Sequence, residues 1–276
     1  MRNTRRTVAG LPIQAVLIVV ALANLVPVYY MVLAAFKGET ELLKNPFGLP
    51  QSFGIGNFIT LIVEKGFWRL FLNSALVAII SVTLALAISC LAAYAFARFR
   101  FVGRKPLFAL ITALMAIPPV VVIVPLFVAM ARVKLLNQYP SVVIIYVGFI
   151  LPFSIFLLTG FFRSIPVALT EAAKIDGASD LQVLLSVVLP LARAPLITLF
   201  LINGLWVWNE LMIAVMFLQK EEMRTLMAGM AFLQGRNVRQ LSLVMAASVM
   251  ASAPMFLVLI AGQRAFVKGL TAGAVK

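Results

Sequence analysis

The chain has 276 residues, of which 63% are apolar and 12% are charged, and its mean hydropathy is +1.08. Soluble domains carry about half apolar and about a quarter charged residues, so this composition excludes a soluble protein and places the chain in a lipid bilayer. One cysteine and no histidine exclude a disulfide framework and a Cys/His metal site. The net charge of +14 would suit nucleic acid, but basic residues in membrane proteins flank the spans, and we expect no nucleic-acid binding.

Long apolar stretches predict six transmembrane helices in one all-α integral membrane domain, residues 1–276. The predicted spans are 11–36, 70–97, 106–130, 140–162, 196–218 and 241–262. The first stretch follows three arginines, as in a signal peptide, but it is too long for one and indicates an uncleaved helix. Residues 37–69 and 219–240 are predicted to be polar loops, and 263–276 a short basic tail.

The third span contains Pro118, Pro119 and Pro125, and we expect it to be kinked or broken. Prolines in a span are tolerated where neighbouring helices or a water-lined cavity satisfy the freed carbonyl groups. The second span has no proline, and its small residues allow close contact with other helices.

The basic residues predict the orientation. If the N-terminus is cytoplasmic, the inner segments hold more than half of the bases. The clearest case is the loop after span two, where Arg98, Arg100, Arg104 and Lys105 occur without an acid. Both termini are therefore predicted to be cytoplasmic.

Residues 163–195 form the one long amphipathic segment of the chain, and no apolar run in it is long enough to cross a bilayer. Pro166 suits the first turn of a helix, and Gly177 can take the left-handed conformation that ends one. Ser179 or Asp180 can cap a second helix, which Pro190 is expected to end. The segment is thus predicted to be two short helices joined by a glycine at a membrane surface.

Several spaced motifs resemble the permease subunits of bacterial ABC importers. Glu171, Ala172, Ala173, then Gly177 and residues 187–190 are similar to the family's EAA loop, with Val187 where the family has isoleucine. Residues 160–166, 175–179, 208–210 and 263–274 resemble the carbohydrate-uptake branch, above all the maltose-type subunit with the shorter N-terminus. The resemblance runs from about span two to the C-terminus.

This resemblance implies the type I importer permease fold, in the inner membrane of a bacterial cell, and a subunit that carries sugar but is not an enzyme. It implies a different second permease subunit, two copies of a cytoplasmic ATPase and an extracytoplasmic sugar-binding protein. ATP and Mg²⁺ would bind to the ATPase and no cofactor to this chain, which has no Walker A sequence. The motifs fit oligosaccharides, monosaccharides, polyols and glycerol phosphates equally.

The resemblance assigns ATPase coupling to residues 163–190. Glu171 and Asp176 are expected to pair with the ATPase surface, while Ala172 and Ala173 allow close packing and Gly177 sets the angle between the helices. Pro190 closes the motif. On spacing alone, the alternative is an ordinary helix start with an i,i+3 pair between Glu171 and Lys174.

The second predicted site is Trp206, Asn209 and Glu210 in span five, because an aromatic face beside amide and carboxylate groups suits a sugar, and an acid within a span is costly. The alternatives are an interfacial aromatic belt, or a Glu210 that only bridges helices. A proton- or sodium-coupled carrier using Glu210 is the competing function.

The third predicted site is the tail. Its resemblance to the maltose-type subunit suggests that Gly269, Thr271 and Gly273 reach the ATPase interface. The alternative is a frayed chain end.

Overall fold

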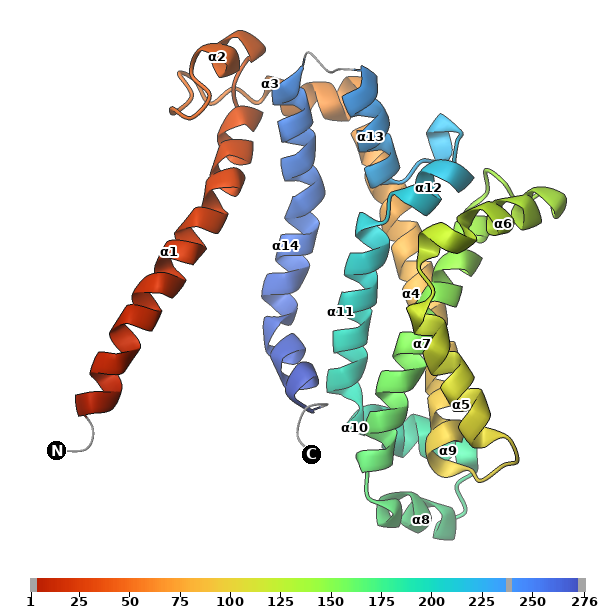
Figure 1. Ribbon diagram of the computed structural model, residues 1–276. Helices are drawn as coiled ribbons and strands as arrows, with labels where there is room; N and C mark the ends of the chain where they lie inside the picture. Colours follow the sequence, from red (N-terminus) through yellow and green to blue (C-terminus); the bar gives the residue numbers. More distant parts are fainter. Residues whose placement is uncertain (1–3, 237–239, 273–276) are drawn as a thin grey trace. The chain divides into compact units, whose positions relative to one another are not determined.

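The computed structural model describes residues 4–236 and 240–272, and every regular element in these ranges is a helix (Figure 1). The long helices are α1 (Thr4–Ala35), α4 (Phe67–Arg98), α7 (Tyr139–Ser164), α11 (Arg193–Asn209) and α14 (Leu241–Ala272). The shorter ones are α2 (Glu39–Lys44), α3 (Gly56–Ile59), α5 (Arg104–Ala113), α6 (Pro119–Arg132), α8 (Val167–Ile175), α9 (Asp180–Val183), α10 (Leu189–Leu191), α12 (Met212–Phe217) and α13 (Leu226–Arg236).

Four of the described helices are long and apolar enough to cross a membrane, with segments Ile13–Ala35, Phe67–Arg98, Tyr139–Ser164 and Leu241–Ile260. Two bent pairs raise the number to six if each counts as one span: Arg104–Ala116 with Pro119–Arg132, and Asp180–Leu191 with Arg193–Asn209. The prediction of an all-α membrane protein is therefore confirmed.

By its contacts the chain divides into two compact units, Met1–Phe67 with Met230–Ala253 and Trp68–Gly229 with Pro254–Lys276. We describe each unit by itself, and the single permease domain stays a prediction.

In the first unit, the predicted polar loop 37–69 is a folded cap built around a buried lysine. Lys37 is 1% exposed, and its Nζ donates hydrogen bonds to the carbonyl oxygens of Asn45 and Gly48, both at 2.6 Å. The amide of Asn57 donates to the carbonyl oxygens of Ala35 and Lys37, each at 2.9 Å. A charge taken out of water must be paired in this way, so these carbonyl groups fix the loop on the end of α1. Glu39 also accepts from the N–H and hydroxyl of Ser242, at the start of α14.

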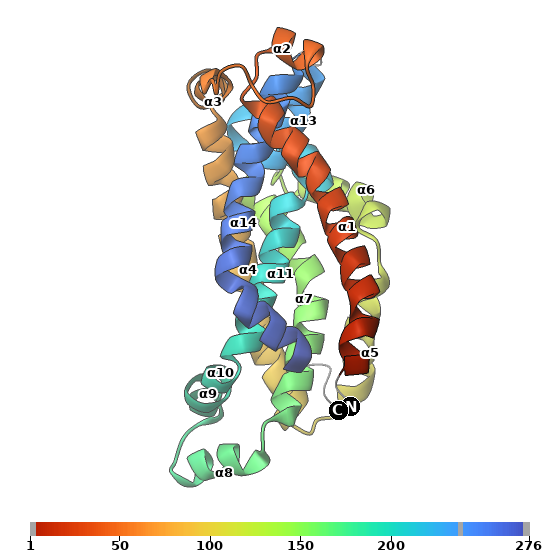
Figure 2. The same cartoon turned by 90° about the vertical axis from the view of Figure 1, so that its left-hand side faces the viewer.

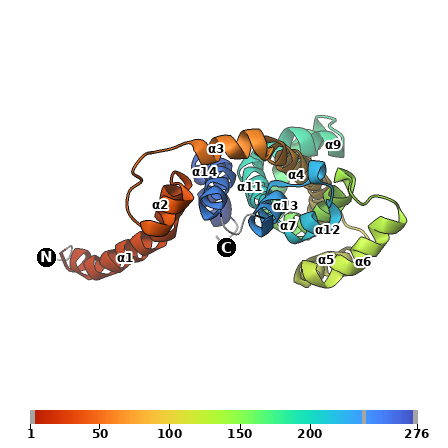
Figure 3. The same ribbon diagram turned by 90° about the horizontal axis from the view of Figure 1, so that it is seen from above.

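In the second unit, α4, α7 and α11 lie side by side (Figures 1 and 2), and Figure 3 shows α5 with α6 on one side of α7 and α9 on the other. One apolar cluster joins α4 and α7 to α12, and a second joins the other halves of α4 and α7 to α9 and α11. Tyr146 and Phe162 on α7 are fully buried in these clusters. The second unit therefore fixes residues 163–210, which hold most of the predicted site residues.

Two of the predicted spans are broken, the first of them at a proline. The third span turns by 100° between Ala116 and Pro119, where Pro118 is extended with φ −67° and ψ 136°. The prediction of a broken span is confirmed, because a residue without an N–H begins a helix more easily than it continues one. The predicted span 196–218 is also interrupted, since α11 ends at Asn209 and α12 begins at Met212.

The predicted loop 219–240 and tail 263–276 need correction. Residues 226–236 form α13, an apolar helix, so the sequence between spans five and six is not all loop. Residues 263–272 of the tail continue α14, and residues 273–276 lie outside the described residues. A Cβ on Gly262 would lie 2.5 Å from the Leu201 Cδ1, so α14 passes close to α11 at that glycine.

Candidate functional site

A tight helix–glycine–helix turn stands at one end of the second unit. Gly177 has φ +86°, its N–H donates to the Lys174 carbonyl and the Ala178 N–H donates to the Ala173 carbonyl, both at 3.0 Å. These two bonds make the Schellman motif that closes a helix with glycine. No atom lies within 4 Å of a Cβ built at Gly177, so the backbone angle and not space requires glycine. The predicted left-handed glycine is confirmed.

The second helix of the element begins with a capping box. The Ser179 hydroxyl accepts from the Gln182 N–H, and the Gln182 side chain accepts from the Ser179 N–H at 2.7 Å. Of the two caps that the sequence offers, Ser179 is the one used. Two capped helix ends within four residues make the angle between α8 and α9 a fixed feature.

α8 projects from the end of the second unit (Figures 1 and 2), and two acids and an apolar side chain on it are exposed. Glu171, Ala172 and Asp176 are exposed, and Ile175 between the acids is 85% exposed. Lys174 makes its ion pair with Asp180 at 2.6 Å and not with Glu171, so the predicted alternative of a Glu171–Lys174 pair is wrong. This hydrogen bond, with the negative charge of Asp180, raises the pKa of Lys174.

Three contacts fasten this element to α4 and α5. The Tyr94 side chain lies close to that of Asp180. Arg98 Nη2 donates to the Ile165 carbonyl at 2.8 Å, and Arg163 Nη2 donates to the Phe96 carbonyl at 3.3 Å while it lies over the ring of Phe108. Guanidinium–carbonyl bonds of this kind are charge-assisted and therefore among the stronger ones in proteins. The sequence interpretation missed Tyr94 and Arg98, because nothing in the spacing pairs α4 with a segment about 80 residues later.

Pro190 lies next to the end of its helix, as predicted. It stands in the first turn of α10, which continues to Leu191, and the chain bends by 79° before α11 starts at Arg193. A π-helical turn, Leu184–Val188, precedes it. The continuous helix Asp180–Leu191 thus ends one residue after Pro190, which fits a proline that cannot continue a helix.

Glu210 occupies the break between α11 and α12 and its carboxylate accepts three hydrogen bonds. The donors are the N–H of Ile213 at 2.9 Å, the N–H of Ala214 at 3.1 Å and the Tyr146 hydroxyl at 2.7 Å. Two of these groups are free donors of the first turn of α12, which have no intrahelical partner. The carboxylate thus caps α12 and ties it to α7, as in the alternative where Glu210 bridges helices.

Unlike Glu210, Trp206 and Asn209 are exposed, and among the described residues neither bridges two helices by hydrogen bonds. The Trp206 ring is 37% exposed and meets the ring of Tyr146 edge-on, with 5.8 Å between centroids, and that of Phe149 at 6.2 Å. The exposed Asn209 amide donates to the Leu205 carbonyl of its own helix at 2.8 Å. Of the three predicted pathway residues, Trp206 has an aromatic face available to a ligand.

An asparagine that the sequence interpretation passed over holds the other end of α12. Asn137 has φ +59°, and its Oδ1 accepts from the N–H groups of Gln219 and Lys220 at 2.7 and 2.9 Å. Its own N–H donates to the Phe217 carbonyl at 2.8 Å. An asparagine in the left-handed conformation beside a turn is the signal that the sequence offered.

Two of the three predicted tail contacts lie within the described residues, and the third does not. Gly269 and Thr271 belong to the backbone of α14, and Gly273 lies outside the described residues.

The chain belongs to the family described as the binding-protein-dependent transport system inner membrane component, whose model matches residues 85–272. It is 40% identical over 252 residues to a putative ABC transporter permease protein of Caldicellulosiruptor sp., covering 91% of each chain. It is 33% identical to the melibiose/raffinose/stachyose import permease protein MelC of Bacillus subtilis (94% of each chain) and 32% identical to the diacetylchitobiose uptake permease NgcG of Streptomyces coelicolor (94% and 86%).

Solved structures agree on the fold. A bacterial ABC transporter involved in the import of the acidic polysaccharide alginate matches with a TM-score of 0.81 and 25% identity, covering 96% of this chain and 98% of that one. The chain is therefore an inner-membrane transport permease that works with a binding protein, and it is not an enzyme. The predicted family and permease fold are confirmed.

Proposed function

We propose that this chain is one of two permease subunits of an ABC importer that carries an oligosaccharide or related carbohydrate into the cytoplasm. The relatives named for diacetylchitobiose and for melibiose, raffinose and stachyose support the substrate class. The partners we propose are a different permease subunit, two copies of an ABC ATPase that bind ATP and Mg²⁺, and an extracytoplasmic sugar-binding protein. Both termini would be cytoplasmic.

The observation that carries the coupling proposal is the exposed α8 element. Glu171 and Asp176 flank the exposed Ile175, and neither acid has an ion-pair partner among the described residues. An apolar side chain between two free charges is a surface made for contact with another protein. We infer that Glu171, Ala172, Ala173, Asp176 and Gly177 contact the ATPase, and that Pro190 lies in the helix that carries the motion onward.

The fixed turn and its fastenings give this contact a mechanical effect. Closure of the ATPase pair would push α8, and the Schellman turn would pass the motion to α9 as a rigid body. Tyr94, Arg98 and Arg163 join the element to α4 and α5. The push would therefore reach the adjacent helices α7 and α11 and, through these side chains, also α4.

For the sugar pathway we propose Trp206 as the stacking surface and the exposed Asn209 as a polar neighbour. Glu210 supports this site indirectly, because the hydroxyl of Tyr146 that packs against Trp206 is bonded to it. The tail residues Gly269, Thr271 and Gly273 remain proposed contacts to the ATPase, and removal of 269–276 with unchanged coupling would contradict that part.

The test is ATPase activity of the purified assembly in lipid, with and without sugar-loaded binding protein. We expect stimulation in the wild type and its loss in Glu171→Lys, because the substitution reverses the charge at the contact. Glu221→Lys is the matched control, an equally exposed acid outside the element, and is expected to behave as the wild type.

Two outcomes would contradict the proposal. Equal stimulation of both variants would remove α8 as the contact. If no ATPase co-purifies, a proton- or sodium-coupled carrier using Glu210 becomes the function to test, by proton uptake in vesicles with Glu210→Gln as comparison.

A further inference from the structure

Residues 99–105, the loop between α4 and α5 together with the first two residues of α5, are called the 99–105 loop and combine positive charge with exposed apolar side chains. Arg100 and Lys105 are exposed and Arg104 half-buried, and no acid occurs between Arg98 and Lys105. Phe101 is 40% exposed, and Val102 at 104% is fully exposed. Among the described residues the one ion pair is Lys174–Asp180, so the three bases of this loop have no acidic partner there.

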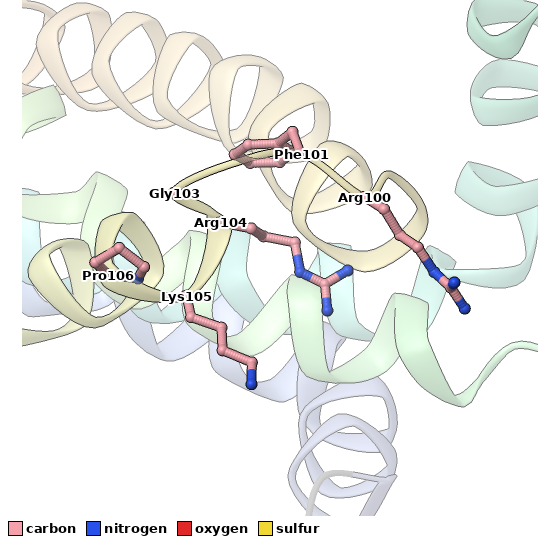
Figure 4. A pocket seen from close by; sticks show the side chains of 6 residues that line it. All are labelled: Arg100, Phe101, Gly103, Arg104, Lys105 and Pro106. Carbon is pink, nitrogen blue, oxygen red and sulfur yellow. The ribbon is translucent and has the colours of Figure 1, made fainter.

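These bases surround an open hollow of about 410 Å³ (Figure 4). Its lining is Arg100, Phe101, Gly103, Arg104, Lys105 and Pro106. Gly103, with φ +83°, makes the sharp turn into α5, and Arg104 Nη1 donates to the Phe99 carbonyl at 2.9 Å. The loop is thus held in shape by its own bonds, and the charges do not need to be gathered when a ligand arrives.

We propose that the 99–105 loop binds the phosphate of an anionic phospholipid, with Arg100, Arg104 and Lys105 around the headgroup and Phe101 and Val102 in the acyl boundary. The charge complements a phosphodiester, and clusters of bases at the end of membrane helices attract anionic lipid. A fully exposed valine next to the bases suits a lipid, which has an apolar part, better than free phosphate.

The position of the loop favours lipid over a docked protein. It lies at the ends of α4 and α5, whereas α8 reaches further out from the same end of the bundle (Figures 1 and 2). A residue at the end of a membrane helix lies at the level of the headgroups. The protein contact proposed above falls on α8, so the lipid site and that contact use different surfaces.

The experiment uses the complete assembly in nanodiscs of phosphatidylcholine with increasing phosphatidylglycerol, and counts retained phosphatidylglycerol by native mass spectrometry. We expect Arg100→Gln/Arg104→Gln/Lys105→Gln to lower the affinity for phosphatidylglycerol by on the order of tenfold or more, because each base near an anionic surface contributes severalfold. The matched control removes three exposed bases elsewhere, Arg69→Gln/Arg132→Gln/Lys134→Gln, and is expected to retain the lipid.

Two milder variants keep the test decisive if the loss of three bases disturbs insertion. Lys105→Gln alone and Val102→Ser alone are each expected to weaken retention severalfold. Equal retention by all loop variants, or an equal loss in the control, would overturn the proposal. Release of the lipid by millimolar inorganic phosphate, with no effect of Val102→Ser, would identify a free-phosphate pocket instead. Loss of the ATPase from the loop variants with lipid retained would identify a protein contact.

Discussion

Two helix breaks in the same unit, at Gly177 and at Glu210, use acids in opposite ways. At the first, Glu171 and Asp176 are exposed and neither has an ion-pair partner among the described residues, while backbone bonds and the Ser179 capping box fix the turn. At the second, the carboxylate of Glu210 accepts from three donors and itself holds the break together. An acid near a helix break is therefore available to a partner only when the chain satisfies its own turn without it.

The largest effect of any substitution is expected at Gly177, at the first of the two breaks. In Gly177→Pro the ring holds φ near about −65° and removes the N–H that bonds Lys174, so the Schellman turn cannot form. We expect sugar uptake into vesicles to fall to background, with the inserted protein at wild-type amounts. Gly177→Asn is the control, because asparagine tolerates positive φ and a Cβ has open space there, and it should retain most uptake. Full uptake by the proline variant would show that the angle does not matter.

At Glu210 we expect a loss of stability and not of coupling. Glu210→Ala leaves two backbone N–H groups and the Tyr146 hydroxyl without their acceptor, and each unpaired buried group costs about 1–3 kcal/mol. The free energy of unfolding should fall by on the order of 3 kcal/mol. In a detergent titration this would be seen as a clearly lower unfolding midpoint. Tyr146→Phe, which removes one donor and keeps the cap of α12, should cost about a third as much.

Trp206→Ala, one turn before Glu210 on α11, is expected to have the opposite effect to Glu210→Ala: a loss of transport with less loss of stability. Its ring is partly exposed, so its removal should weaken sugar-dependent transport severalfold by raising the half-saturating concentration while the unfolding midpoint moves less. If Glu210→Ala changed sugar affinity at unchanged stability, and Trp206→Ala did not, the roles assigned to the two residues would be reversed.

The smallest effect is expected at the fastening of the first break. Tyr94→Phe removes the hydroxyl that lies beside Asp180 but leaves the Lys174–Asp180 pair, a change of at most about 1 kcal/mol. Sugar transported per ATP hydrolysed should fall two- to fivefold, because the element then moves partly independently of α4. Tyr29→Phe, which loses one hydroxyl bond to the Phe47 carbonyl in the other unit, is the control and should keep the ratio. A lower unfolding midpoint with an unchanged ratio would make Tyr94 a structural residue only.

The sequence predicted what depends on local chemistry. Gly177 at positive φ and the break at Pro118 follow from the conformations open to glycine and proline, and a cap at Ser179 or Asp180 follows from their side-chain oxygens; the structure has the first two and uses Ser179 as the cap. The membrane location follows from apolar stretches, which need no knowledge of the fold.

Only the tertiary structure decided which charges are satisfied. From the sequence, Lys37 is predicted to be a base in a polar loop, but in the structure it is buried among carbonyl groups. Glu210 is predicted to be an acid of the sugar pathway, but in the structure it caps a helix. Arg98 and its partner Ile165 lie 67 residues apart in the chain, and Tyr94 and Asp180 lie further apart still. Spacing carries no signal across such a distance, since which donor meets which acceptor depends on how the helices pack. The sequence by itself therefore determined the long apolar helices and the resemblance to the family, and packing determined which acids and bases are left for a partner.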